Sequence, residues 1–306
     1  MNKILYVAGW GRSGSTVLDV ILGNHPDVVS VGEVTYLVDD WNASGRRCAC
    51  GASYTDCSFW NGLAEVESLT EETAQMVRKV ERRSATLPVL LDAISAKLKE
   101  RYRRFQQDVF SYLAETTGAS IVVDSSKSAG DAAMRFYALS QIAEFDVHVL
   151  HLVRDGRSTM ASYVNKGSNW ALEGHAEPLL LPGVRAVGGW TLANLWTLAV
   201  SKMYFRSDRY MRVQFEDLIT HPARTLEATG AFIGIDVDML IDRVRCGDHF
   251  DVGHNVGGNR IRHNQSIQLR HKSGAERQPW SNLNAFHSTF FAIFGQWLNS
   301  KLGYNW

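Results

Sequence analysis

A strand, a glycine-rich turn and the start of a helix follow one another within the first 16 residues, and this order limits the folds open to the chain. The apolar run KILYVAG (3–9) has the length of a buried strand, and GWGRSGST (9–16) leads from it into a helical pattern at Ser15. A strand that turns directly into a helix is typical of a β–α–β unit, whose strands are parallel. We therefore expect an α/β protein.

Further apolar runs repeat this alternation along the chain. We predict strands at 28–32, 120–124, 147–153 and 210–215, and helices from about Ser15, Ala129, Gly156 and Ala186, with a last helix over about 283–302. Short strands between longer helical patterns predict three layers, with a central, mostly parallel sheet between flanking helices. Because the 306 residues contain no repeat and no low-complexity linker, we expect a single domain over residues 1–306.

Two regions interrupt the alternation. Residues 41–119 form a long helical insertion, with a cysteine cluster near its start and charged helical sequence after it. Residues 165–190 are rich in glycine and contain two prolines. A connection of that length in a compact domain is typical of a lid or a substrate wall, or of a disordered segment. We predict that 165–190 is a lid or substrate loop.

The overall charge argues against some classes of partner. The 32 basic and 32 acidic side chains balance, which disfavours a non-specific binder of nucleic acids or other polyanions. The apolar run at the start is too short for a signal peptide or a membrane anchor, and polar residues at helical spacing interrupt FHSTFFAIFGQWL (286–298). We therefore expect a cytoplasmic protein without nucleic-acid or membrane partners. The oligomeric state is not readable from the sequence.

The glycine-rich turn has the properties of an anion site. Its glycines allow a tight turn with inward backbone amides, and the helix that begins at Ser15 favours an anion at its N-terminus. The spacing fits G-x-x-x-x-G-K-[ST], except that Ser15 replaces the lysine with which nucleoside triphosphatases bind the β- and γ-phosphates. A donor whose transferred group carries less charge needs less positive charge from the loop. A sulfuryl group attached to a phosphate is a group of this kind. A plain strand-to-helix turn is the alternative.

The whole stretch GWGRSGSTVLDVILGNHPDVVSVGE (9–33) resembles the 5′-phosphosulfate loop of sulfotransferases that use 3′-phosphoadenosine-5′-phosphosulfate (PAPS). The resemblance implies a P-loop-like fold and sulfuryl transfer from PAPS as co-substrate, without a metal. It also implies which residues bind the 5′-phosphosulfate: Arg12, Ser13, Gly14, Ser15 and Thr16.

Two later stretches extend the resemblance to the 3′-phosphate. In HLVRDGRSTMASYVNKG (151–167), Ser162 follows Arg154 by two helical turns, as in the arginine–serine pair that binds this phosphate in the family. The stretch HNVGGNRIRHN (254–264) resembles in position the late loop that covers the nucleotide, with Arg260 and Arg262 as candidates. The alternative for Arg154 and Ser162 is an ordinary arginine at a helix start and an ordinary serine within the helix. The alternative for 254–264 is a basic loop exposed to solvent.

Sulfuryl transfer to a hydroxyl requires a base for the acceptor proton and cations near the transferring group. Glu33 follows a short predicted strand, at the carboxyl edge where parallel sheets bind ligands, and resembles in position the catalytic glutamate of tyrosylprotein sulfotransferases. Lys127 follows the third strand and resembles the lysine that assists the bridging oxygen in that branch. We predict Glu33 as general base, and Arg12 and Lys127 as electrostatic stabilisers. A helix-start carboxylate and a surface lysine are the alternatives.

Three cysteines lie close together at 48, 50 and 57. A closed zinc site needs a fourth ligand, and no second C-x-x-C or H-x-x-x-H lies nearby, so we predict no metal. A disulfide and reduced structural thiols both stay open, with reduced thiols favoured. The segment and the following Phe-Trp resemble a C-x-C-G…C-x-F-W pattern in bacterial-type sulfotransferases, which favours a structural or acceptor-side role.

Two other functions compete with sulfuryl transfer. In a P-loop kinase or NTPase with a degenerate loop, Asp124 at the end of IVVD would reach magnesium, but the missing lysine and the arginine–serine pair argue against it. A non-catalytic nucleotide-binding module would not need Arg12, Glu33 and Lys127 together. We expect the acceptor to be a small molecule with a hydroxyl group, with an amine as the alternative.

Overall fold

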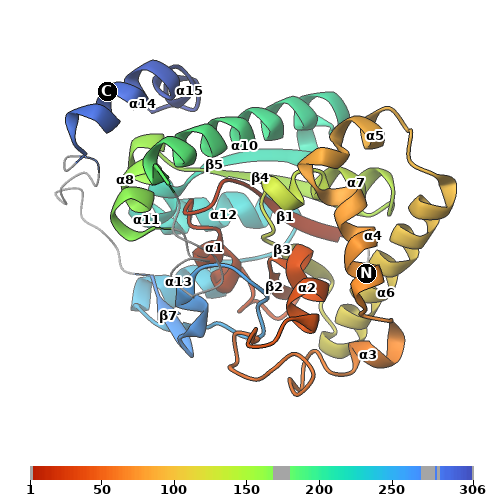
Figure 1. Ribbon diagram of the computed structural model, residues 1–306. Coiled ribbons are helices and arrows are strands. Elements are labelled where there is room, and N and C mark those ends of the chain that lie inside the picture. Colours follow the sequence, from red (N-terminus) through yellow and green to blue (C-terminus); the bar gives the residue numbers. More distant parts are fainter. Residues whose placement is uncertain (1–2, 168–179, 270–279, 281–282, 305–306) are drawn as a thin grey trace.

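Five parallel strands form the central sheet, with β1 in the middle of the order β2-β3-β1-β4-β5 (Figure 1). The computed structural model describes residues 3–167, 180–269, 280 and 283–304. The strands are β1 (Lys3–Gly9), β2 (Val28–Gly32), β3 (Ile121–Asp124), β4 (Asp146–Val153) and β5 (Tyr210–Gln214). All five lie where the apolar runs predicted strands, and the parallel pairing confirms the expected α/β fold.

Helices join these strands and cover both faces of the sheet (Figure 1). Before β4 they are α1 (Ser15–Leu22), α2 (Leu37–Asn42), α3 (Leu63–Val66), α4 (Glu71–Glu81), α5 (Thr86–Leu90), α6 (Ala96–Thr117) and α7 (Arg135–Gln141). After β4 they are α8 (Gly156–Lys166), α10 (Pro182–Tyr204), α11 (Phe215–Thr220), α12 (Pro222–Ile233), α13 (Asp238–Cys246), α14 (Ala285–Phe294) and α15 (Gln296–Lys301). None of the described helices has the length and apolarity needed to cross a bilayer.

Shorter elements complete the chain. The strands β6 (His249–Asp251) and β7 (Ser266–Gln268) form a separate antiparallel pair. Single turns of 3₁₀ helix are η1 (Val34–Tyr36), η2 (Arg83–Ala85), η3 (Gly130–Ala132), η4 (Ser207–Arg209) and η5 (Arg260–His263).

The side chains of β1 alternate between two cores, which explains its unbroken apolar sequence. Ile4 and Tyr6 are buried in one core with side chains of α4, α6 and α7. Leu5 and Val7 are buried in the other with side chains of α1, α12 and α13. Parallel strands covered on both faces are apolar at every position, because neither face meets water. The three predicted layers are therefore present.

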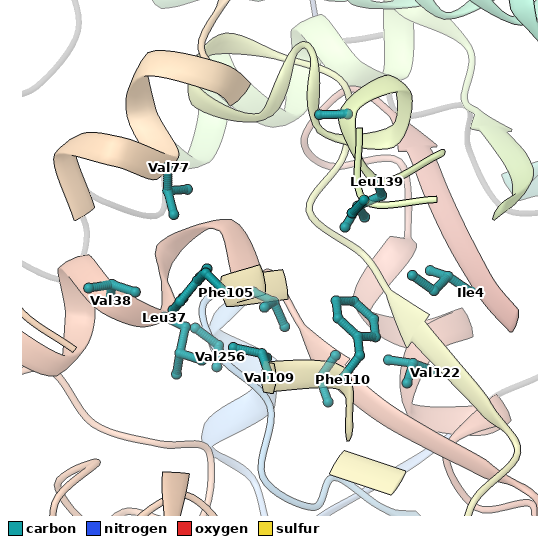
Figure 2. Packing of buried hydrophobic residues seen from close by; sticks show 14 of the residues in the cluster. Ile4, Leu37, Val38, Val77, Phe105, Val109, Phe110, Val122, Leu139 and Val256 are labelled. Carbon is teal, nitrogen blue, oxygen red and sulfur yellow. The ribbon is translucent and has the colours of Figure 1, made fainter. Parts of the chain in front are cut away.

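The helices between β2 and β3 belong to the first of these cores. Figure 2 shows Val77 of α4 and Phe110 of α6 in one packed cluster with Ile4 of β1 and Val122 of β3. Residues 41–119, predicted as an insertion, thus supply much of the apolar cover of one sheet face.

A buried arginine adds a charged link between these helices and the sheet. Arg135 begins α7 and is 1% exposed; its Nε lies 2.7 Å from an oxygen of Asp124, at the end of β3. Its guanidinium also pairs with Glu81, the last residue of α4. Glu81 accepts further hydrogen bonds from Thr35 Oγ1 and Tyr102 Oη, both at 2.8 Å. Arg135 therefore joins β3, α4, α6 and the segment after β2.

Three helix boundaries differ from the prediction. The helix expected near Ala129 begins only at Arg135, because Ala129 is extended and Gly130 has a positive φ of 55°. The helix expected near Ala186 begins at Pro182, whose fixed φ and missing N–H suit a first helical position. The last helix is divided at Gly295, which has a φ of −112° between α14 and α15.

The predicted lid at 165–190 is in part helical. Its end, from Pro182, forms the first turns of α10. Residues 168–179 lie outside the described residues. The lid prediction therefore applies at most to the segment between α8 and α10.

We predict that Arg135→Met lowers the free energy of unfolding by about 3–5 kcal/mol, because it leaves two buried carboxylates without their cation. Urea denaturation measures this loss. Arg82→Met is the control, since Arg82 and its partner Asp131 are 45% and 44% exposed and their pair is worth less than about 1 kcal/mol. Equal effects of the two substitutions would contradict the structural role of Arg135.

Helix α10 passes close to the loop after β1, and two adjacent glycines test this contact. A Cβ on Gly189 would lie 2.2 Å from the Trp10 ring, whereas one on Gly188 would have nothing within 4 Å. Gly189→Ala is expected to cost about 1–3 kcal/mol through overpacking. Gly188→Ala is expected to stabilise by about 0.5–1 kcal/mol through helix propensity. Urea denaturation of both variants checks the difference in sign; a loss from Gly188→Ala would argue against this packing.

Candidate functional site

The loops that follow β1, β2 and β3 line one cavity of about 370 Å³ at the carboxyl edge of the sheet. Helix α8, helix α10 and the segment after β6 complete its wall. The main lining residues are Trp10, Gly11, Arg12, Gly14, Ser15, Thr16, Glu33, Tyr36, Arg83, Ser126, Lys127, Asp131, Tyr163, Gly189, Gly258, Asn259 and Ile261. The cavity lies where an open α/β sheet binds its ligands.

The glycine-rich loop presents backbone amides and hydroxyls to this cavity. Gly14 has a φ of 88° and precedes α1, and no side chain caps the helix N-terminus. Ser13 is 2% exposed, and its Oγ has no hydrogen-bond partner within the described parts of the chain. A helix N-terminus next to an unpartnered buried hydroxyl suits an anion. The structure thus brings together the loop residues that the sequence singled out.

Glu33 and Lys127 form an ion pair at the cavity wall. Lys127 Nζ contacts Glu33 Oε1, and the two side chains are 15% and 11% exposed. Lys127 has a positive φ of 70°, and Tyr6 Oη donates a hydrogen bond to its carbonyl. A non-glycine residue held in the left-handed region is typical of functional sites. The structure therefore joins the predicted base and one predicted cation.

Arg12 is the second cation at this wall and also has a left-handed backbone, with a φ of 69°. Its guanidinium donates to the carbonyl of Gly167 at 2.7 Å and lies 5.7 Å from the centre of the Tyr163 ring. Partial burial lowers the pKa of Arg12. The charge of Arg12 is thus held at the cavity by the end of α8.

Two hydrogen bonds set the position of Glu33. Its backbone N–H donates to the carbonyl of Val256 at 2.7 Å, and Val256 N–H donates to Val31 at 2.9 Å. Gly32 between them has a φ of 72°, and a Cβ there would lie 2.3 Å from the Val256 carbonyl oxygen. Only glycine allows the two backbones to approach this closely.

The loops that carry Glu33 and Lys127 are also tied to each other. Ser126 Oγ accepts a hydrogen bond from the Thr35 amide at 3.1 Å. The hydroxyl of the same Thr35 donates to Glu81, which Arg135 neutralises. The buried cluster around Arg135 therefore extends to both sides of the candidate ion pair.

The late segment reaches the cavity, but its arginines do not line it. Asn259 N–H donates to Thr16 Oγ1 at 3.1 Å, so the segment touches the glycine-rich loop. Arg262 is buried and donates to the Gly258 carbonyl at 3.1 Å, whereas Arg260 is exposed. The contact of either arginine with a 3′-phosphate stays a prediction.

The arginine–serine pair lies behind the glycine-rich loop. Arg154 donates to the Arg12 carbonyl at 2.7 Å and lies 4.8 Å from the centre of the Phe215 ring. Its Nε has no hydrogen-bond partner among the described residues, and burial lowers the pKa of Arg154. Ser162 is half-buried on α8 and does not line the cavity. Their role in binding also stays a prediction.

Asp124 is engaged elsewhere and does not face the cavity. It is fully buried, accepts from the Ser126 amide at 2.9 Å and pairs with Arg135. A magnesium-binding aspartate would have to turn toward the phosphates. The position of Asp124 therefore argues against the kinase alternative.

Several lining residues were not identified from the sequence. Tyr163 faces Arg12, and burial raises the pKa of Tyr163 to about 12, so its hydroxyl keeps its proton near neutral pH. Tyr36, Asn259 and Arg83 come from three further segments. Tyr163 follows Ser162 on the same predicted helix, and Asn259 lies in the late stretch 254–264, so both belong to segments that the sequence singled out.

A second group of polar side chains lies apart from the cavity. Cys48, Cys50 and Cys57 are free thiols in the structure, so the disulfide alternative is not seen. His254 joins them, although it is 197 residues beyond Cys57. The sequence pointed to the cysteines but not to the histidine.

Comparison with known proteins agrees with this architecture. The sulfotransferase domain from the curacin biosynthetic pathway has a TM-score of 0.51 at 18% identity, over 99% of this chain and 98% of that chain. A sulfotransferase from Mycobacterium avium has a TM-score of 0.51 at 14% identity, over 98% of this chain and 76% of that chain. At these identities the likeness shows the fold alone.

The family is assigned by a sequence profile and not by a solved structure. A further solved structure, the sulfotransferase domain from the Synechococcus PCC 7002 olefin synthase, is 23% identical over 78% of this chain and 76% of that chain, with a TM-score of 0.48, and adds nothing to that assignment. No curated protein matches the chain at a significant level. A sequence profile of the sulfotransferase family matches residues 5–239, which is well over half of the chain. The chain therefore belongs to the sulfotransferase family.

Proposed function

We propose that the protein transfers a sulfuryl group from PAPS to a hydroxyl group, or alternatively an amine, of a small-molecule acceptor. The observation that carries the proposal is the ion pair of Glu33 and Lys127 in a cavity that Arg12 and the N-terminus of α1 also border. The cavity volume of about 370 Å³ is in the range of small-molecule sites. Family membership supports sulfuryl transfer as the reaction class.

The glycine-rich loop fits the 5′-phosphosulfate of PAPS. The unpartnered hydroxyl of Ser13 and the uncapped start of α1 supply donors for an anion. The residues that would hold this group are Arg12, Ser13, Gly14, Ser15 and Thr16. PAPS, when bound, supplies the sulfuryl group and leaves as 3′-phosphoadenosine-5′-phosphate (PAP).

The 3′-phosphate is assigned to Arg154 and Ser162, with Arg260 and Arg262 as further candidates. The support from contacts is strongest for Arg154, whose Nε is buried without a partner among the described residues. A buried guanidinium N–H without an acceptor is costly, and a phosphate oxygen would satisfy it. Arg154 also donates a hydrogen bond to the Arg12 carbonyl and so links the two proposed phosphate sites.

Glu33 is proposed as the general base. It would accept the proton of the acceptor hydroxyl, as a carboxylate within reach of the reacting group can. Lys127, which pairs with this carboxylate, would together with Arg12 offset the negative charge that develops during transfer. Neither cation has to move into the cavity, since both already line it.

The proposed reaction uses residues from most of the chain as one unit. The glycine-rich loop follows β1, Glu33 follows β2 and Lys127 follows β3. The late segment that borders the cavity follows β6. The helices of 41–119 share a core with the sheet. We therefore propose that residues 1–306 act as a single domain.

Binding of the donor product tests the assignment of PAPS. We expect PAP to bind tightly without magnesium, and ATP–Mg²⁺ and 5′-AMP to bind at least tenfold more weakly, as measured by calorimetry. Arg154→Ala is expected to weaken PAP binding by about 10–100-fold, because a charge-assisted contact is worth about 1.5–3 kcal/mol. Arg206→Ala, at an arginine that is 85% exposed, is the control. Preference for ATP–Mg²⁺ would overturn the proposal.

Substitution of Glu33 separates the chemical step from donor binding. Glu33→Gln keeps the shape of the side chain but removes the base, so turnover is expected to fall by about 10²–10⁴-fold while the Kd for PAP changes little. The assay measures transfer from labelled PAPS to a panel of phenols, alcohols and amines. Glu65→Gln on α3, at an exposed carboxylate, is the control. Wild-type turnover in Glu33→Gln would exclude Glu33 as the base.

A further inference from the structure

Three thiols and an imidazole from two distant segments converge outside the cavity. Cys48, Cys50 and Cys57 lie between α2 and α3, and His254 follows β6. Their Sγ and nitrogen atoms all lie within 4.8 Å of one another. Such convergence cannot come from local sequence, because the histidine is 197 residues from Cys57.

Three of the distances between these atoms lie close to the edges of a zinc tetrahedron. Bonds of about 2.3 Å to sulfur and 2.0–2.1 Å to nitrogen place ligand atoms roughly 3.5–3.8 Å apart. The Sγ atoms of Cys50 and Cys57 are 3.7 Å apart, and His254 Nδ1 lies 3.7 Å from Cys48 Sγ and 3.2 Å from Cys57 Sγ. A disulfide would require about 2.05 Å between sulfurs. The spacing is therefore that of ligands around a common centre.

Backbone hydrogen bonds hold the thiols in this arrangement. Cys48 N–H donates to the Ala52 carbonyl at 3.0 Å, and the Cys48 carbonyl accepts from Gly51 at 2.9 Å. The Cys57 carbonyl accepts from the amide of Trp60 at 3.0 Å. Cys48 and Cys57 are fully buried, whereas Cys50 is exposed and leaves the group open to solvent on one side.

The imidazole is oriented by two aromatic neighbours. The ring of His254 stacks on Phe59, with centres 4.8 Å apart and planes at 5°. The His254 carbonyl accepts a hydrogen bond from Trp60 Nε1 at 2.8 Å. Fixed in this way, the ring directs Nδ1 to the thiols. Outer contacts that orient a ligating histidine are a usual feature of metal sites.

We propose that Cys48, Cys50, Cys57 and His254 bind one Zn²⁺ ion in a closed, structural site. Three thiolates and a neutral imidazole fill a tetrahedral shell, so no position is left for a reacting water. Each thiol releases its proton to solvent as its sulfur–zinc bond forms. The ion has no part in the transfer reaction, which still requires no metal.

Such an ion would fasten the wall of the cavity. Asn255 follows His254 directly, and its carbonyl accepts from the Ala49 amide at 3.2 Å. The next residue, Val256, holds Glu33 through the backbone hydrogen bond already described. The proposed site therefore joins the 48–57 loop to the segment that positions Glu33.

Metal content of the purified full-length protein tests the proposal directly. We expect about one zinc per chain by elemental analysis after dialysis under reducing conditions. Cys57→Ser and His254→Ala are expected to lower the content at least tenfold. The matched controls are Cys246→Ser and His249→Ala, exposed residues of the same types that are expected to retain all the zinc. An equal loss of zinc in a control and its matched site variant would overturn the proposal. Wild-type protein that holds no zinc after incubation with excess zinc and dialysis would also overturn it.

Two further measurements on the unaltered chain remain informative if a site variant does not fold. Cobalt exchanged into the wild-type protein is expected to show the thiolate charge-transfer and tetrahedral d–d absorption bands of a three-sulfur, one-nitrogen site. Chelation is expected to lower the melting temperature, and added zinc to restore it. Octahedral cobalt spectra, or a Cys50–Cys57 disulfide in the protein as purified, would contradict the site. PAP binding does not enter either readout.

Discussion

The buried charge of Arg135 is the interaction on which the arrangement of the candidate site depends. It neutralises Asp124 at the end of β3 and Glu81 at the end of α4. Through Asp124 it shapes the turn that leads to Lys127, and through Glu81 and Thr35 it holds the segment after Glu33. A cation without access to water thus fixes two loops whose own charged side chains face the cavity.

The cavity combines a floor at the edge of the sheet with a wall that comes in part from far along the chain. The floor is the edge of the sheet, where the residues after β1, β2 and β3 meet. Beside α8 and α10, the wall includes the late segment from His254 to Ile261, which contacts Glu33 through Val256 and Thr16 through Asn259. Neither part alone encloses a ligand, so the properties of the site depend on how firmly the late segment is held.

Much of the fold and part of the site could be predicted from local sequence. Strands buried on both faces are continuous apolar runs, and an anion loop needs glycines at fixed spacing, so both are visible within a few residues. The meeting of Glu33 and Lys127 followed from the rule that parallel strands end at one edge. Tyr163, Asn259 and His254 lie in stretches that the sequence singled out, but they were not identified as site residues, because tertiary packing alone selects them from the other polar residues there. The predicted helix starts near 129 and 186 were wrong. The backbone geometry at Ala129 and Gly130 delays the first helix to Arg135, and Pro182 begins the second helix earlier than predicted.

The dependence on a late segment has a consequence for biosynthesis. All five strands of the large sheet precede Val256 and Asn259 in the chain, and domains tend to fold from the N-terminus as they emerge from the ribosome. Glu33 and Lys127 are therefore synthesised before the two residues that tie the late segment to Glu33 and to the glycine-rich loop. The order of synthesis alone makes this cover the last part of the cavity lining to be added.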